Sequence, residues 1–426
     1  MNSSFTPLKT YQGISIEELK TLINERDIYI WGCGHLGRII KRCLEKNELS
    51  IKSFCDSDPK LNAFFIDNVK VISPQDVINY ARSKQAFIII ASMRYRDEIE
   101  ESCISAGLVK KEDFLSYIHI SRPEVAIDVA GKCNIKCPSC PMGNMENLLP
   151  AGYMPAYIYK QVLNKLLLEL PLLMNIDLSS WGEPFMNPEL AEIIQMTETM
   201  IPCTVSTNLQ ISDKLEDVIK AQPSQLIVST SGYGKSYEIN HAGASWQVFF
   251  DNIHLLKELI DKYKPKSQIT VLYHLYRNNQ QQDLDNLRSL CLKLGLKFST
   301  TWAYLNPYDK ILDFCEGRDV GTQAQKVLDV LSWDLMHSLK LSKTEAQDPC
   351  LCQRIFPIIN WDLSVSLCHI YYYPIISNNF LDTPLDEILK LRHTQSQCVI
   401  CQKHGLHRLD IEILLKKYPK DKILLQ

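Results

Sequence analysis

Short apolar runs alternate with amphipathic stretches through the middle of this chain. The apolar runs predict strands at residues 125–129, 174–178, 204–206, 226–229, 269–274 and 297–301. Between them, apolar residues recur at helical spacing in stretches such as 156–168, 188–199, 248–263 and 281–294. Repeated strand–helix units predict a parallel sheet. Functional groups in such folds gather at the C-terminal ends of the strands.

A smaller α/β pattern comes first, in residues 28–118. Its predicted strands cover residues 28–31, 51–55 and 86–91, with helices after the first and third. The first strand leads into Gly32, Gly34 and Gly37, and Asp56 follows the second strand. This spacing is typical of a Rossmann-type cradle, because glycines let the backbone approach a phosphate and the helix N-terminus favours negative charge. NAD is the less favoured ligand, since the unit is about half the length of a dinucleotide domain.

The last part of the chain, residues 345–426, is rich in cysteine and poor in long periodic segments. Only residues 385–392 and 410–417 show a helical pattern. We therefore predict three domains, residues 1–120, 121–344 and 345–426, whose boundaries are placed where the hydrophobic pattern changes rather than at linker sequences. The overall fold class is α/β, with a short α+β extension at the C-terminal end.

Composition and charge exclude several functional classes. The chain has 426 residues, 22% of them charged, and a net charge of −3, so it has no basic excess with which to bind nucleic acid. The longest apolar stretch, residues 166–178, is interrupted by polar residues and is too short to span a bilayer. The first residues show no secretory pattern. We therefore expect no membrane association and a cytoplasmic location.

Fifteen cysteines are a high number for such a chain, and in a reducing compartment they indicate metal binding or catalysis rather than disulfides. Cys43, Cys103 and Cys291 stand alone in helical stretches, where we expect small buried side chains. The others of interest form two groups, one near residue 137 and one between residues 350 and 401.

Cys133, Cys137 and Cys140 form a CxxxCxxC loop after an apolar strand. Four-iron clusters usually take four thiolates, so a loop with three leaves one iron open for another ligand. The alternatives are a zinc knuckle without its fourth ligand and three unrelated thiols. The spacing resembles that of the radical S-adenosylmethionine (radical SAM) superfamily, in which the open iron of a [4Fe–4S] cluster chelates SAM.

This resemblance implies a partial (β/α)6 barrel in residues 121–344 and roles for several strand-end residues. Gly182, Glu183 and Pro184 resemble the "GEP" element, which contacts the SAM amino group. Polar residues at later strand ends are similar to those that bind the SAM ribose and carboxylate, namely Ser206, Asn208, Ser229 and Arg277. For Arg277, a surface position is an equal alternative. Ser139 departs from the family pattern, where an aromatic residue near the adenine is common.

The activity that the resemblance implies is reductive cleavage of SAM to methionine and a 5′-deoxyadenosyl radical, which abstracts hydrogen from a small-molecule substrate. A one-electron reductant such as flavodoxin or ferredoxin would be the partner. Oxidation, epimerisation and rearrangement are the possible outcomes. Epimerisation needs a hydrogen donor, for which Cys203 and Cys315 are candidates.

The second cysteine group resembles the twitch appendage, the shortened relative of the SPASM extension, which holds an auxiliary [4Fe–4S] cluster. The predicted ligands are Cys352, Cys368, Cys398 and Cys401, with Cys350 as the alternative to Cys352. In the hairpin between the first two ligands, Leu363 stands where the family has glycine. A four-thiolate zinc site is the alternative, because the same spacings permit it. His404 and His407 are candidate substitutes for a missing thiolate, and a surface position is the favoured alternative for each.

The N-terminal segment is similar to domains of polysaccharide-biosynthesis proteins, which favours a sugar or nucleotide-sugar substrate. A docking or purely structural role for this segment is the alternative. Peptide modification is the second choice of activity, because its enzymes usually carry a winged-helix recognition domain that this sequence does not suggest. The third choice is a non-catalytic protein that binds an iron–sulfur cluster or zinc.

Overall fold

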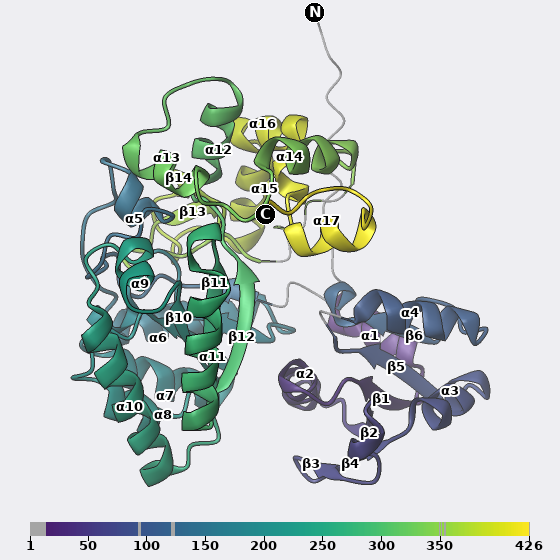
Figure 1. The fold of residues 1–426 in the computed structure, drawn as a ribbon. Helices are drawn as coiled ribbons and strands as arrows, with labels where there is room; N and C mark the ends of the chain where they lie inside the picture. Colours follow the sequence, from purple (N-terminus) through teal and green to yellow (C-terminus); the bar gives the residue numbers. More distant parts are fainter. Residues whose placement is uncertain are drawn as a thin grey trace, which may run out of the picture. The chain divides into compact units, whose positions relative to one another are not determined.

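The structure is a computed structural model that describes residues 14–92, 95–120, 124–348, 350, 352 and 355–425 (Figure 1). The first residues, which bear on a secretory leader, lie outside this range. Contacts divide the chain into two compact units. One holds Tyr11–Val125 together with Leu166–Ile176, and the other includes Ala126–Lys165 and the chain from Asp177 onward. The predicted boundary near residue 120 lies close to this division, whereas a separate domain beginning at residue 345 stays a prediction.

The elements of the N-terminal unit alternate between strands and helices. They are α1 (Ile16–Ile23), β1 (Asp27–Trp31), α2 (His35–Lys46), β2 (Ile51–Cys55), η1 (Pro59–Leu61), β3 (Phe65–Ile66), β4 (Val69–Ile72), α3 (Pro74–Arg82), β5 (Ala86–Ile90), α4 (Arg96–Ser105), β6 (Phe114–Ser116) and η2 (Tyr117–His119). The three predicted strands are confirmed as β1, β2 and β5.

The six strands of this unit form one sheet in the order β3-β4-β2-β1-β5-β6. Strand β1 pairs in parallel with β2 on one side and with β5 on the other. The direction of winding therefore reverses between β1 and β5, which is the switch point where α/β sheets of this kind bind ligands. Apolar clusters cover both faces of the sheet, which explains why every residue of β5 is buried.

The central elements follow the predicted alternation of strand and helix. They are β7 (Glu124–Ala126), α5 (Pro141–Asn144), α6 (Ala156–Glu169), β8 (Asn175–Asp177), η3 (Pro184–Met186), α7 (Leu190–Met200), β9 (Cys203–Thr207), α8 (Leu215–Ala221), β10 (Gln225–Thr230), α9 (Lys235–Asn240), α10 (Trp246–Tyr263), β11 (Gln268–Leu275), η4 (Arg277–Asn279), α11 (Gln282–Leu294) and β12 (Lys297–Trp302). Local signals set their ends. Ser245 caps α10 by accepting from the backbone N–H of Val248, and Gly295 ends α11 in the left-handed conformation.

The central sheet has the order β12-β11-β10-β9-β8-β7, so its strands lie in sequence order with β7 and β12 at the edges. Strands β9 to β12 pair in parallel. Helix α7 packs on β9, and α11 lies beside β12 (Figure 1). This order agrees with the (β/α)6 arrangement predicted from the sequence. Curvature of the sheet into a partial barrel stays a prediction.

The C-terminal elements are mostly helical. They are α12 (Tyr308–Cys315), α13 (Thr322–Leu328), α14 (Leu335–Thr344), β13 (Val365–Cys368), β14 (Tyr371–Ser377), α15 (Leu385–His393), α16 (Ser396–His404), η6 (Leu406–Arg408) and α17 (Ile411–Lys417). The two predicted helices are α15 and α17. Strands β13 and β14 form an antiparallel hairpin.

A tight turn precedes the hairpin at the position predicted from the sequence. Leu363 has a φ of 70°, the left-handed conformation that glycine adopts without strain. The turn closes by two backbone hydrogen bonds, from Leu363 N to Asn360 O at 3.0 Å and from Asn360 N to Ser364 O at 2.8 Å. Leucine therefore replaces glycine here without loss of the turn. The neighbouring indole of Trp361 donates to Pro150 O at 3.0 Å and lies so close to Gly131 that a Cβ there would be 2.0 Å from it.

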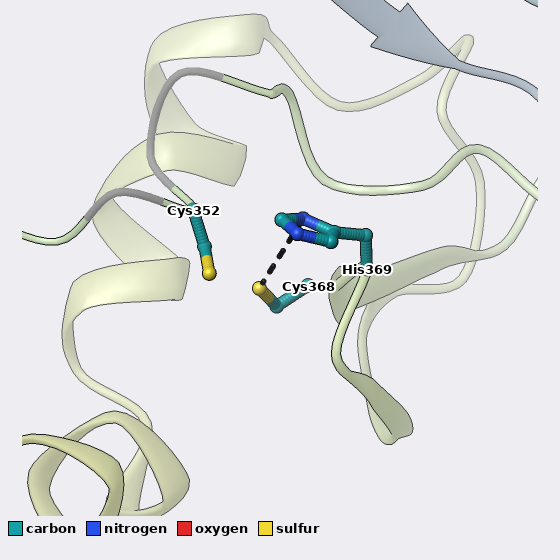
Figure 2. Close-up of side chains that lie close together, drawn as sticks. All are labelled: Cys352, Cys368 and His369. Atoms are coloured by element: carbon teal, nitrogen blue, oxygen red, sulfur yellow. Dashed lines mark hydrogen bonds between the residues drawn. The ribbon is translucent and has the colours of Figure 1, made fainter. Parts of the chain in front are cut away.

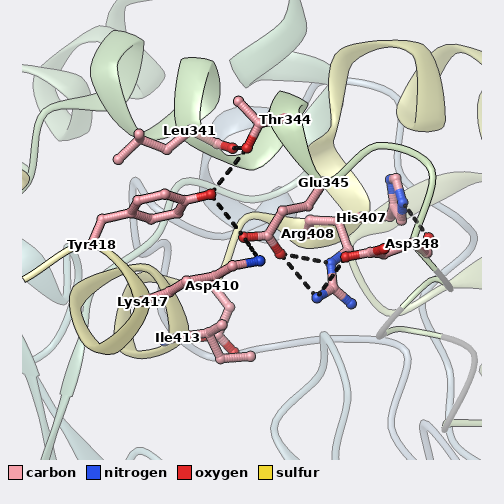
Figure 3. Close-up of polar contacts among 10 residues, drawn as sticks. All are labelled: Leu341, Thr344, Glu345, Asp348, His407, Arg408, Asp410, Ile413, Lys417 and Tyr418. Carbon is pink, nitrogen blue, oxygen red and sulfur yellow. Dashed lines mark hydrogen bonds and ion pairs between the residues drawn. The ribbon is translucent and has the colours of Figure 1, made fainter.

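A buried carboxylate joins α14 to α17 (Figure 3). Glu345 is 4% exposed and accepts from Lys417 Nζ at 2.8 Å, from Arg408 Nη2 at 3.0 Å and from the Tyr418 hydroxyl at 3.4 Å. Burial alone would raise the pKa of Glu345, but the hydrogen bonds from Lys417 and Arg408 outweigh it and lower the pKa below 4.5. The ionised carboxylate therefore stabilises the folded state.

None of the helices in the described part of the chain has the length and apolar character that a membrane span requires.

Candidate functional site

The CxxxCxxC loop follows β7 and ends at Cys140, which caps α5. Hydrogen bonds to distant parts of the unit hold the loop on two sides. Lys136 N donates to Ala242 O at 2.7 Å, and Asn306 N donates to Ser139 O at 3.0 Å. The hydroxyl of Tyr276, a buried residue after β11, bonds to the side chain of Ser139. Contacts on two sides therefore position the loop.

The three cysteines of this loop lie close enough to influence one another. Burial raises the pKa of Cys133 to about 11 and that of Cys140 to about 12. The pKa of Cys137 is raised well above its ordinary value by burial and then by the neighbouring Cys140 and Cys133 sulfurs. The backbone N–H groups of Ile135 and Met142 donate to the sulfurs of Cys133 and Cys140. Half-buried, converging thiols with N–H donors suit an iron–sulfur cluster, whose binding replaces the thiol protons.

The Gly182–Glu183 segment lies directly against the cysteine loop. A Cβ on Gly182 would stand 1.4 Å from Ala130 O, so only glycine fits at this position. Glu183 N donates to Lys132 O at 2.9 Å. Pro184 follows at the start of η3 and is buried. The two loops are thus in backbone contact, which the sequence resemblance implied but did not establish.

Glu183 and Asn208 connect three loops. Glu183 is 3% exposed, and its carboxylate accepts from Asn208 N at 2.8 Å and from Phe185 N at 3.2 Å. Burial raises the pKa of Glu183 to about 7 despite these hydrogen bonds. The Asn208 amide donates to Cys133 Sγ at 3.7 Å and to Asn134 Oδ1 at 2.9 Å. The structure therefore brings Glu183, Asn208 and Cys133 together.

Asp128 is a site residue that the sequence analysis missed. It lies just after β7, is 4% exposed, and accepts from the backbone N–H groups of Ala130, Trp181 and Gly182 at 3.3 Å each. Burial raises the pKa of Asp128 to about 7. One carboxylate thus holds the start of the cysteine loop and the Gly182 loop together. The available signal was an acidic residue inside the apolar run 125–129.

Ser206 and Ser229 lie on the same face of the central sheet. In the parallel register Ser206 is beside Ile227, and Ser229 is beside Leu272. Because side chains alternate along a strand, Ile227, Ser229, Leu272 and His274 share this face. All of these residues are only half-buried, whereas the intervening residues of β10 and β11 are mostly fully buried. The two predicted serines therefore belong to the less covered face.

His274 is a second residue that was missed, and its tautomer is fixed. Its Nδ1 lies 3.1 Å from Thr230 O, and a carbonyl only accepts, so Nδ1 carries the proton and Nε2 is the acceptor. Burial lowers the pKa of His274, which keeps the ring neutral. Arg277, by contrast, is exposed and donates to Asp329 O. Its predicted role toward SAM remains a prediction.

The second cysteine group surrounds one cavity. The cavity is lined by Cys350, Cys352, Leu367, Cys368, Ile370, Tyr371, Arg392, Cys398, Cys401, Gln402 and His407. The sulfurs of Cys352 and Cys368 and a ring nitrogen of His369 lie within 4.8 Å of one another (Figure 2). Interaction with the Cys352 side chain lowers the pKa of Cys350 and that of Cys368. Five thiols at one cavity fit a four-thiolate centre, and both Cys350 and Cys352 remain candidates for the first ligand.

The surface position expected for His407 is wrong. This histidine is 3% exposed, lines this cavity, and lies 3.2 Å from Asp348 O through Nε2. Its burial follows from its place in η6, directly after the helix that carries Cys398 and Cys401. His404 is half-buried and faces Glu316 at 3.8 Å.

The glycine loop of the N-terminal unit has the geometry expected at a βα turn. A Cβ would stand 2.5 Å from Ala91 O at Gly32 and 1.9 Å from Gly32 O at Gly37, whereas Gly34 faces open space. Asp56 accepts from Cys33 N and Cys33 Sγ, both at 3.1 Å. The acid therefore braces the loop in this structure, and a role in binding a ribose remains a prediction.

The comparisons with known proteins cover the two parts of the chain differently. A family model described as "C2185-like, N-terminal" matches residues 24–113. No significant match was found among curated proteins. The match therefore describes the N-terminal unit alone.

Among solved structures, three are similar to this chain over most of its length. SuiB of Streptococcus suis bound to the precursor peptide SuiA is 13% identical, with a TM-score of 0.44, over 75% of this chain and 77% of that one. Native anSMEcpe with bound AdoMet is 15% identical, with a TM-score of 0.43, over 71% and 92%. BtrN in complex with AdoMet and 2-DOIA is 14% identical, with a TM-score of 0.37, over 67% and 91%.

Proposed function

We propose that this chain is a radical SAM enzyme with one auxiliary iron–sulfur cluster. The observation that carries the proposal is the contact between the cysteine loop and the Gly182 loop. Three half-buried thiols, the backbone of Gly182 and Glu183, and the Asn208 amide meet at one place. A zinc knuckle would need a fourth ligand from nearby. The neighbouring Glu183 carboxylate is instead engaged by backbone N–H groups.

Cys133, Cys137 and Cys140 would hold three irons of a [4Fe–4S] cluster and leave the fourth for SAM. When reduced, such a cluster supplies the electron that cleaves SAM to a 5′-deoxyadenosyl radical. Glu183 would orient its loop toward the SAM amino group. Its pKa of about 7 would fall when an ammonium binds beside it, because a neighbouring positive charge favours the ionised carboxylate. His274 and the less covered face of the sheet would receive the substrate.

The cysteines around the C-terminal cavity would hold the auxiliary cluster and make oxidation the favoured outcome, since that cluster can accept the substrate electron. Epimerisation is less favoured, because neither of the two candidate hydrogen donors, Cys203 and Cys315, is an exposed thiol. Cys203 is fully buried, and burial raises its pKa well above the ordinary value. Cys315 is half-buried, and burial raises its pKa as well. A one-electron reductant such as flavodoxin or ferredoxin would supply the first cluster.

The proposal predicts that the reconstituted, reduced protein converts SAM to 5′-deoxyadenosine and that Cys137→Ala abolishes this conversion. Cys291→Ala is the matched control, because Cys291 is a fully buried thiol in α11. Product is measured by liquid chromatography under anaerobic conditions. Equal 5′-deoxyadenosine formation by Cys137→Ala and the unmodified protein would sink the assignment, and a non-catalytic metal protein would then be the better description.

For the substrate, we propose a sugar or nucleotide sugar, with peptide modification as the alternative. The support is the glycine loop at the switch point between β1 and β5, where a nucleotide phosphate fits at the N-terminus of α2. Uridine-diphosphate sugars at 100 times their dissociation constant should stabilise the unit that they bind by about 2.7 kcal/mol. Thermal unfolding of the whole chain with and without these nucleotides measures this, and Gly34→Trp should remove the effect. No shift with any nucleotide sugar would leave peptide modification as the first choice.

A further inference from the structure

Arg392 is a buried arginine at the edge of the C-terminal cavity. It lies near the end of α15 and is 3% exposed. Its Nη2 donates to Cys352 O at 2.9 Å and to Cys368 Sγ at 3.6 Å, and its Nη1 donates to Ile355 O at 3.1 Å. The Cys398 thiol in turn donates to the Arg392 carbonyl at 3.3 Å. The guanidinium is therefore fixed among the cysteines by several contacts.

A buried guanidinium stays charged, so it needs a negative partner to offset the loss of water. Arg408, in the same region, has such a partner in the carboxylate of Glu345 at 3.0 Å. Within the described residues, Arg392 is in no carboxylate ion pair within 4.0 Å, and the groups that act on its charge are the sulfurs of Cys368, Cys350, Cys352 and Cys398. Neutral thiols would leave this cation uncompensated. A negatively charged centre in the cavity would compensate this cation.

We propose that Arg392 is the counter-cation of a metal–thiolate centre in this cavity. Four thiolates around a metal carry a net negative charge, and the guanidinium offsets it through direct contact with Cys368. If the centre is the auxiliary cluster of the proposed function, its one-electron reduction adds one further negative charge. Arg392 then favours the reduced state and raises the reduction potential, which suits a centre that accepts an electron. Arg392 is a positioning and charge-compensating residue in this account and does not contact substrate.

Cobalt(II) tests the counter-cation role without assuming which metal is native. The parent protein is the full chain without the first cysteine group, so that only the second site remains; it carries Cys133→Ala, Cys137→Ala and Cys140→Ala. It is titrated anaerobically with cobalt(II). Binding is followed by the thiolate-to-cobalt absorption. Arg392→Gln should weaken cobalt binding at least about tenfold, and Arg392→Lys, which keeps the charge, should stay within about threefold of the parent. Arg288→Gln is the control, because Arg288 is exposed and pairs with Asp285 on α11.

The outcomes of this titration separate charge from packing. A selective loss in Arg392→Gln supports the proposal. Equal affinities in the parent, Arg392→Gln and Arg392→Lys would overturn it. An equal loss in both variants would also overturn it, because the site would then depend on the shape of arginine rather than on its charge. Circular dichroism of each variant verifies that the chain is folded.

Iron reconstitution of the same four proteins tests the redox part. Arg392→Gln should lower the equilibrium constant for reduction of the second cluster at least tenfold, which lowers its reduction potential by at least 59 mV for one electron. The potentials of Arg392→Lys and Arg288→Gln should stay near that of the parent. Unchanged potentials in Arg392→Gln would overturn the redox part. A parent that binds cobalt but holds no iron would contradict the auxiliary cluster of the proposed function, and the cobalt affinities would still decide the role of Arg392. A parent that binds neither metal would contradict both.

Discussion

Gly182 illustrates how a single residue can set the geometry of the candidate SAM site. Its backbone lies against Ala130 at the start of the cysteine loop, with no room for a Cβ. Asp128 fixes the same contact from the other side by accepting from Gly182 N and Ala130 N. A methyl group at this position would push the two loops apart.

We therefore expect Gly182→Ala to destabilise the larger unit by about 1–3 kcal/mol, the usual cost of overpacking, and to lose iron from the first site. Gly34→Ala is the control, because a Cβ there meets nothing within 4 Å, and it should change stability by less than about 1 kcal/mol. Urea unfolding followed by tryptophan fluorescence measures the difference. Equal stabilities and equal iron contents for the two variants would contradict the role given to Gly182.

For single residues, the sequence predicts the candidate ligands better than it predicts the residues that hold those ligands in place. Cys133 could be named from spacing, and Glu183 and Asn208 from the family resemblance, and the three were found together. Asp128 and Arg392 could not, because their roles depend on burial and on partners far away in sequence. A charged residue in a strand or helix pattern is more often exposed, and only the fold shows that these two are buried.

Among the elements, the central strands were the most predictable. Each has a run of apolar residues that is buried on at least one face, so the pattern survives in the sequence. Helix α16, by contrast, was missed. Its sequence, residues 396–404, has no apolar stripe, and Cys401, which lines the cavity, is its buried residue. A helix whose buried side chain is a single cysteine leaves no periodic apolar signal.

The C-terminal helices are also joined by the Glu345 network, which makes a pH-dependent contribution. The pKa of Glu345 is lowered in the folded state, so its contribution is fully present above pH 4.5 and is lost as the pH falls below that value. Glu345→Gln should cost about 1.5–3 kcal/mol at pH 7, the range for hydrogen bonds to a charged group.

The stability difference between Glu345→Gln and the unmodified protein should then shrink between pH 7 and pH 4. Urea unfolding at both pH values measures it, and Glu412→Gln, a substitution in the first turn of α17, is the control. A difference that stays constant with pH would show that the carboxylate charge contributes nothing to the effect.

On the scale of the whole molecule, the chain combines an N-terminal α/β unit with a larger unit that carries both cysteine groups. The order of strands in each sheet follows from repeated βα units, so the α/β class was predictable. Inclusion of residues 345–426 in the larger unit was not, because it depends on long-range contacts. One such contact places Trp361 against Gly131, at the start of the cysteine loop.

Two four-iron clusters in one chain are the central claim, and counting iron and acid-labile sulfide per chain tests it most directly. After anaerobic reconstitution the account predicts about eight of each, and about four of each in the variant lacking Cys133, Cys137 and Cys140. About four of each in the unmodified protein, unchanged in that variant, would contradict the first site and with it the radical SAM assignment. About four of each, reduced to none in that variant, would contradict the auxiliary cluster.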